Sequence, residues 1–201
     1  MSSFYQQHIP LVQEVLASFH EILRHGKSYA AEKALDEAAL LQARLAPDML
    51  DLRQQLGCVV RYVNRVLEIG QVGVAKEVSE QDATFDSLTA VIDAVQAQLA
   101  KIQPERFNAN QHGSVRCVSY PSGYRATIPD NALFMSNLLR PLIFFHLTTT
   151  YNILRNQGAP LGKAVYMAPW WNPVFEDAWQ NCDPPAADPE AVQQHGGPID
   201  K

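Results

Sequence analysis

Residues 140–163 read RPLIFFHLTTTYNILRNQGAPLGK, and this stretch decides the fold. Its aromatic and β-branched run predicts a buried helix that begins near Pro129 or Asp130 and ends near Gln157. We expect Gly158 to follow it in the left-handed conformation, and Pro141 to kink it near residues 137–140. His146 stands inside the apolar run. Its imidazole must find a partner or lose its charge, so it is either a satisfied core histidine or the centre of a site.

Three earlier segments repeat apolar residues at the three- and four-residue spacing of one helix face. The stripes are Ile9, Val12, Leu16, Phe19 and Leu23; Met49, Leu52, Leu56, Val59, Val63 and Val66; and Phe85, Leu88, Ile92, Val95 and Leu99. We expect Gly26 to end or bend the first helix, unless residues 29–33 carry it one more turn, and a short helix to follow at residues 37–45. Asp48 is placed to cap the second long helix, and Pro104 to close the third.

Residues 114–120 and 124–128 alternate in polarity around Pro121, Ser122 and Gly123, which predicts a small β-hairpin before the last helix. The expected architecture is an all-α four-helix bundle over residues 1–163, with one crossover connection before the last helix. Residues 164–201 form a Pro- and Trp-rich extension. We expect its first part, up to Trp179, to pack on the bundle and the part from Asp183 onward to be mobile.

Composition excludes several classes of protein. The chain has 201 residues, is 47% hydrophobic and carries a net charge of -5 without a basic stripe, which argues against a nucleic-acid partner. Three widely spaced cysteines suggest neither a disulfide framework nor a zinc ribbon. No signal peptide and no apolar run long enough to span a membrane are apparent, so we expect a cytoplasmic protein.

Two blocks of sequence resemble a known family. Residues 41–49, LQARLAPDM, resemble the L-x-A-R-L-x-x-D-M motif at the second helix of an uncharacterised family of DinB/YfiT-like proteins. Residues 144–163 are similar to that family's F-F-H-x-T-T-A-Y-x-I-L-R-x-x-G-x-x-L-G-K ending, and residues 82–88 resemble its third-helix start. Pro141 also stands where the family's pattern has proline. The likeness covers residues 4–165.

The resemblance implies an up-down-down-up four-helix bundle, often dimeric, in a superfamily of which many members hold a divalent metal with three histidines. One of these lies on the second helix and two form an H-x-x-x-H pair on the last; some such members are thiol S-transferases. This chain departs from that pattern. Thr150 stands four residues after His146, and the second helix has no histidine. We therefore expect no cofactor and no metal from that triad.

His146 is the candidate acid/base, with Asp48 and Tyr151 as catalytic partners. Asp48 could cap its helix or orient the imidazole, and Arg44 could pair with Asp48 or bind an anion. The remaining residues expected to contact substrate are Phe145, Thr149, Thr150, Trp170 and Trp171.

Three functions stay open on the sequence alone. The first is metal-independent acid/base chemistry on a small molecule in an apolar bundle cavity, of the isomerase, cyclase or lyase type. The second is a metal-dependent transferase or hydrolase at a remodelled site, in which His20 meets His146 beside Asp48 or Glu21. The third is a non-catalytic bundle that binds a ligand or forms a homodimer.

Overall fold

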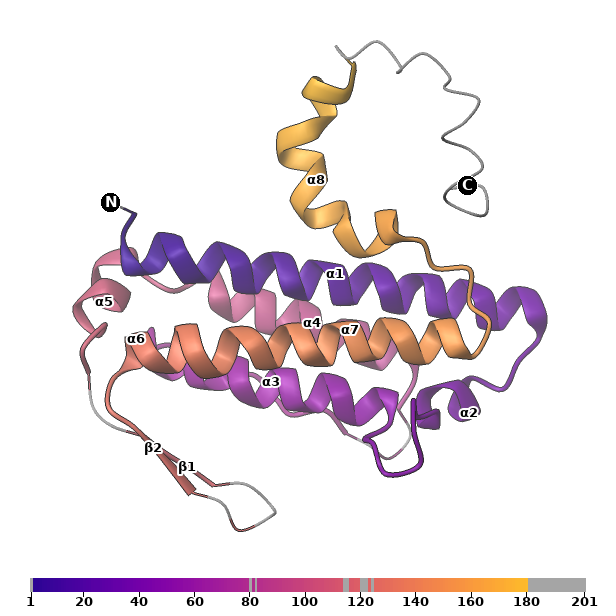
Figure 1. Cartoon of the computed structure of the whole chain (residues 1–201), viewed down its shortest axis with the longest axis horizontal. Coiled ribbons are helices and arrows are strands. Elements are labelled where there is room, and N and C mark those ends of the chain that lie inside the picture. Colours follow the sequence, from indigo (N-terminus) through magenta and orange to yellow (C-terminus); the bar gives the residue numbers. More distant parts are fainter. Residues whose placement is uncertain are drawn as a thin grey trace, which may run out of the picture. The chain divides into compact units, whose positions relative to one another are not determined.

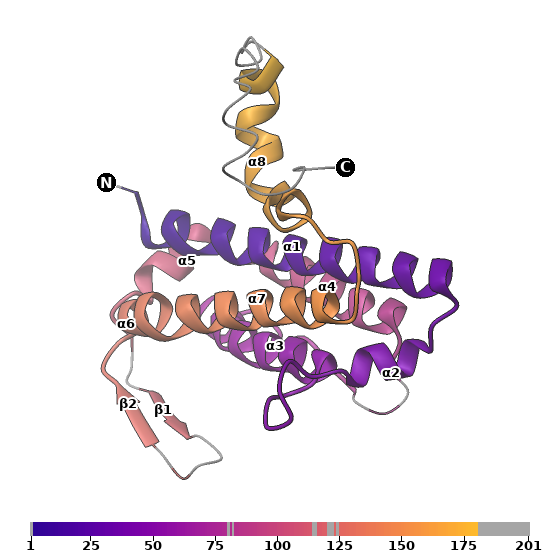
Figure 2. The ribbon, with the colours of Figure 1, turned by 45° about the vertical axis from the view of Figure 1, so that its right-hand side comes forward.

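Four long helices lie side by side in the computed structural model, which describes residues 2–79, 81, 83–113, 116–119, 123 and 125–180 (Figure 1). They are α1 (Phe4–Lys33), α3 (Leu52–Ile69), α4 (Phe85–Leu99) and α7 (Arg140–Asn156). Helix α1 packs against α4 and α7, and α3 packs against the same two helices. The turned view in Figure 2 shows the same grouping. The protein is therefore all-α in its core, as the sequence predicts.

The crossover connection lies between α3 and α4, which agrees with the up-down-down-up order that the family resemblance implies and not with a crossover before the last helix. The carbonyl of Ile69, at the end of α3, accepts a hydrogen bond of 3.0 Å from Asn110 at one end of the bundle. Helix α4 begins at the opposite end, where the N–H of Phe85 donates to the carboxylate of Glu37 in α2 (Glu37–Gln42). Residues 70–84 must therefore run the length of the bundle, so α3 and α4 are parallel. The predicted crossover before the last helix is wrong, because α4 and α7 are joined at one end.

The apolar stripes of the sequence form the core. Apart from Met49, all of their members are buried. Helix α1 continues through Gly26 instead of ending there, and a Cβ at Gly26 would stand 2.9 Å from Leu154 Cδ1 and 3.0 Å from Phe85 Cε1. The glycine thus allows α4 and α7 to approach α1 closely.

Helix α3 begins three residues later than the sequence predicts. Its N-cap is Asp51, whose carboxylate accepts the N–H of Gln54 at 3.0 Å while the Gln54 side chain accepts the N–H of Asp51 at 3.1 Å. This reciprocal capping box satisfies two N–H groups of the first turn. Asp48 is exposed in the preceding turn, so its predicted capping role is wrong.

The last helical region runs from Asp130, the N-cap of α6 (Asn131–Leu133), through a π-helical segment η1 (Phe134–Leu139) into α7. In η1 the N–H of Arg140 bonds the carbonyl of Met135, five residues back. The wider turn directly precedes Pro141, where the sequence predicts a kink and where proline has no N–H to continue an α-helical ladder. Gly158 has φ 90°, and the N–H groups of Gly158 and Ala159 bond the carbonyls of Arg155 and Leu154, as a Schellman motif requires. The predicted helix end is confirmed.

Smaller elements complete the chain. Pro104 opens α5 (Pro104–Ala109), and strands β1 (Arg116–Ser119) and β2 (Arg125–Ile128) pair antiparallel. The chain divides into two compact units after Pro169, within α8 (Lys163–Gln180), so the predicted packing of the extension on the bundle stays a prediction. Its predicted mobile end, and the hairpin turn at residues 120–122, lie outside the described residues. Within the residues that are described, no helix combines the length and apolar character that a membrane crossing requires.

Candidate functional site

His146 lies at the seam between α3 and α7, where two residues of α3 meet it. Its Nδ1 is 2.7 Å from Oε1 of Gln55, and its ring stacks on Tyr62 with 6.3 Å between ring centroids and 27° between planes. Gln55 and Tyr62 are seven residues apart on α3, and this spacing places both on one helix face. Both His146 and Gln55 are buried, with 7% and 1% of their surface exposed.

The contacts of Gln55 decide which nitrogen of His146 carries the proton. The amide nitrogen Nε2 of Gln55 donates to the carbonyl of Leu50 at 2.9 Å, which leaves Oε1 facing the imidazole. A carbonyl oxygen only accepts hydrogen bonds, so the Nδ1–H of His146 is the donor. The lone pair of the neutral ring is then on Nε2.

Nε2 of His146 is the ring nitrogen that no side chain bonds within the described residues. It is not a fully buried atom without a partner; in the described part of the chain that condition holds for Asn131 Oδ1. Nε2 therefore keeps some contact with solvent, although the His146 side chain as a whole is buried. Burial, and secondarily the charge of Arg61, lower the pKa of His146 from 6.5 to about 4, so the ring is neutral at physiological pH.

Arg61 and Cys58 extend the site along α3. Arg61 is exposed, and its Nη2 donates to the Sγ of the buried Cys58 at 3.1 Å. The guanidinium lies one helical turn further along the same face and places a cation beside the buried thiol.

Phe145 is the predicted substrate residue that the structure places beside His146. Its ring meets the imidazole edge-on, with centroids 5.3 Å apart and planes at 80°. The side chain is 53% exposed. An apolar surface thus borders the imidazole.

Asp48 and Arg44 do not form the predicted pair. Gln55, not Asp48, contacts Nδ1 of His146, because Asp48 lies in the turn outside α3. Arg44 instead donates to the carbonyl of Met49 and lies 3.6 Å from the buried carboxylate of Asp51. It holds the segment that carries Leu50, and hence the carbonyl that orients Gln55.

Tyr151 is not brought to His146. Its hydroxyl donates to the carbonyl of Leu161 at 2.8 Å, and its ring packs edge-on against Tyr166. It is five residues from His146, so the two side chains point about 140° apart around α7. Tyr62 occupies the place beside the imidazole that the sequence gives to Tyr151.

The hydroxyl groups of the two predicted threonines are used within α7. Thr149 donates to the carbonyl of Phe145 at 2.8 Å, and Thr150 donates to the carbonyl of His146 at 2.9 Å. These back-bonds engage both hydroxyl groups within the helix, and the predicted contact of the two threonines with substrate stays a prediction. Trp170 and Trp171 belong to the second compact unit, and their role in binding stays a prediction.

The residues around His146 do not fit the three-histidine metal of the wider superfamily. Gln55 occupies Nδ1, Thr150 replaces the second histidine of the last helix, and α3 contains no histidine. In the ranges that the structure describes, no three histidine, cysteine, aspartate or glutamate side chains gather as metal ligands would.

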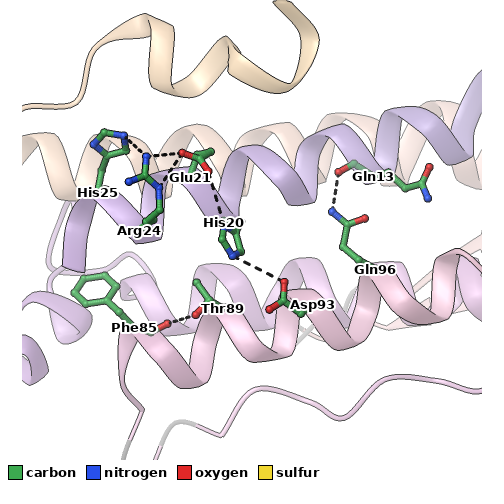
Figure 3. Close-up of polar contacts among 9 residues, drawn as sticks. All are labelled: Gln13, His20, Glu21, Arg24, His25, Phe85, Thr89, Asp93 and Gln96. Atoms are coloured by element: carbon green, nitrogen blue, oxygen red, sulfur yellow. Dashed lines mark hydrogen bonds and ion pairs between the residues drawn. The ribbon is translucent and has the colours of Figure 1, made fainter. Parts of the chain in front are cut away.

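His20 lies on α1 and faces α4, whereas His146 lies on α7 and faces α3 (Figure 3). Its Nε2 is 3.9 Å from Oδ1 of Asp93, and its Nδ1 is 3.9 Å from Oε1 of Glu21. The same face carries a hydrogen bond of 3.2 Å from Gln96 to the carbonyl of Gln13. The remodelled site that joins His20 to His146 is therefore not formed.

Sequence reasoning misses Gln55, Arg61 and Tyr62. One signal was available, since Gln55 and Tyr62 flank the apolar stripe at a spacing of seven. Nothing in the sequence pairs that stripe edge with His146, because the contact spans 91 positions along the chain.

A solved structure and a protein family are similar to this chain. No curated protein matches it. A crystal structure of a DinB family member protein from Shewanella denitrificans is similar, with a TM-score of 0.68 and 25% sequence identity. The similarity covers 81% of this chain and 90% of that one. The family described as Domain of unknown function (DUF1993) matches residues 4–167, which include α1, α3, α4 and α7 with Gln55 and His146. The chain belongs to this family.

Proposed function

We propose that this chain is an enzyme that acts on a small molecule by metal-independent acid/base chemistry of the isomerase, cyclase or lyase type. The observation that carries the proposal is the fixed tautomer of His146: Gln55 accepts from Nδ1–H and leaves Nε2 as a base. The same pairing of an acceptor with one imidazole nitrogen orients the general base of many enzymes.

The environment of Nε2 is suited to proton transfer. The base is neutral at physiological pH because burial lowers its pKa to about 4. A pKa this far below physiological pH makes Nε2 a weak base whose protonated form returns the proton readily. Phe145, at the edge of the ring, offers an apolar surface for the body of a substrate, which supports an apolar binding cavity.

The test uses solvent deuterium, because a base that removes a carbon-bound proton exchanges it with the solvent. Untagged protein is incubated with a mixture of small metabolites in D₂O and a chelator, and mass spectrometry detects compounds that gain deuterium or change mass. We expect labelling or conversion with the wild type and none with His146→Gln. His112→Gln, which changes an exposed histidine of the same type, is the control.

Equal labelling by His146→Gln would exclude His146 as the base. If the wild type binds a compound without converting or labelling any, the protein is a ligand-binding bundle instead of an enzyme. Loss of activity in the chelator alone would favour the metal-dependent alternative.

A further inference from the structure

Arg61 carries a charge that no carboxylate compensates within the described residues. Helix α3 has three arginines, of which Arg53 pairs with Asp51 at 2.7 Å and Arg65 pairs with Glu68 at 3.1 Å. The printed sequence of α7 contains no acidic residue, and Glu68, already paired, is the single acidic residue of α3. The hydrogen bond of Arg61 is to the Cys58 thiol, which brings no full negative charge while it is protonated.

The guanidinium lies back along α3 instead of extending into solvent. Its Nη2 is 3.1 Å from Cys58 Sγ, and its Nη1 is 3.8 Å from the place where a Cβ on Gly57 would stand. Cys58 is three residues from Gln55 and lies on the side of α3 that leads toward it, whereas Gly57 faces the connection at Val78, which is also 3.8 Å from that Cβ position. The guanidinium thus spans the outer surface of α3 between these two sides. A guanidinium has five N–H groups, so one bond to sulfur leaves several donors for a planar anion.

Two rings border the same region. Tyr62, next to Arg61 in the chain, stacks on the imidazole of His146, and the half-exposed Phe145 meets that ring edge-on. A cation beside aromatic surfaces suits a ligand that has a carboxylate group and a flat apolar body.

From this arrangement we infer that Arg61 binds the carboxylate of a small aromatic or unsaturated acid whose body lies against Phe145 and Tyr62. The inference rests on the proposed function, since it names the class of substrate for the same site. It also supplies what the base needs. Burial is the first cause of the lowered pKa of His146 and the charge of Arg61 the second; an anion at Arg61 offsets the second cause, which raises the pKa and makes Nε2 a better proton acceptor when substrate is bound.

The test compares phenylacetate with phenylacetamide, its neutral isostere, in titrations of the ¹⁵N-labelled full chain followed by NMR. We expect saturable shifts at residues of α3 and α7 with phenylacetate and at least about tenfold weaker binding of the amide. Arg61→Gln should weaken phenylacetate binding by about tenfold or more. Arg61→Lys, which keeps the charge but not the planar fork, should bind with an intermediate affinity.

Arg65→Gln is the matched control, because it removes an exposed arginine of the same helix that has its own carboxylate partner. Its affinity should stay within about twofold of the wild type. Equal affinity of wild type and Arg61→Gln, equal affinity for acid and amide, or no saturable shift with the wild type would overturn the inference.

Failure of this inference is distinguishable from failure of the proposed function. If the affinity for phenylacetate does not depend on Arg61 while deuterium labelling still depends on His146, the enzyme takes another class of substrate. If Arg61 binds the acid but no labelling occurs, the site binds carboxylates without acting as a base.

Discussion

The burial of His146 makes the stability of the protein depend on pH in a defined direction. Its pKa is about 4 in the folded protein and 6.5 when unperturbed, so the unfolded chain binds the proton first as the pH falls. The neutral imidazole therefore contributes stability that is complete above the unfolded value of 6.5. This contribution is lost progressively down to the folded value of about 4.

The size of the effect follows from the two pKa values. The unfolded chain takes up the His146 proton at a higher pH than the folded protein does. This difference lowers the unfolding free energy by about 2 kcal/mol between about pH 7.5 and about pH 5. The wild type loses this amount through His146 over that range. His146→Gln, which has no titratable group there, lacks this loss, and its change in stability between the two pH values should be about 2 kcal/mol smaller.

The assay is urea denaturation of both proteins at the two pH values, followed by circular dichroism. His8, whose pKa burial and the charge of Arg140 also lower to about 4, is present in both proteins and cancels in the comparison. His112→Gln should keep the full wild-type dependence, because that side chain is 78% exposed. An identical loss of stability in wild type and His146→Gln would refute the reasoning, whatever the absolute stability of the variant.

Three further predictions test the packing and the site. Gly26→Ala should lower the unfolding free energy by about 1–3 kcal/mol through overpacking, whereas Gly57→Ala, whose new Cβ has only ordinary contacts, should raise it by about 0.5–1 kcal/mol; similar urea curves for the two would contradict the close helix approach. Asp51→Ala should lower the unfolding free energy by about 3 kcal/mol, since it removes the cap of α3 and the buried carboxylate that Arg44 and Arg53 contact, while Asp48→Ala should lower it by less than about 0.5 kcal/mol; the reverse order in thermal or urea melts would restore the cap that the sequence suggests. Gln55→Glu places a carboxylate against the imidazole Nδ1 and should raise the pKa of that ring well above about 4 in an NMR titration, and an unchanged value would mean that the two side chains do not meet.

The sequence predicts the parts of this protein that depend on local order. The apolar stripes and the end of α7 at Gly158 follow from residue spacing and from the backbone freedom of glycine, and the structure confirms both. The sequence predicts the wrong cap for α3 because Asp48 and Asp51 have the same side chain and each directly precedes an apolar residue of the stripe. The choice between them depends on the buried pairing of Asp51 with Arg44 and Arg53.

The site itself depends on contacts between distant segments. A periodic pattern identifies His146 as buried, but its partner is fixed by which edge of α3 faces α7. That edge in turn depends on the crossover at residues 70–84, whose place follows from the up-down-down-up order that the family resemblance implies and not from residue spacing. The sequence alone therefore does not identify Gln55 as the partner of His146.

The π-helical segment at residues 134–139 has a consequence for how insertions and deletions act on this fold. A π-turn accommodates one residue more than an α-turn of the same rise. Deleting a single residue there would restore a regular α-helix of almost unchanged length and would leave α6 and α7 in nearly the same rotation about the helix axis, because the wide turn is what absorbs the extra residue. The same deletion inside α7 itself would rotate the two sides of the helix by about 100° relative to each other. The π-helical segment is thus the place in this helical region where the chain can lose one residue while His146 keeps its position against α3.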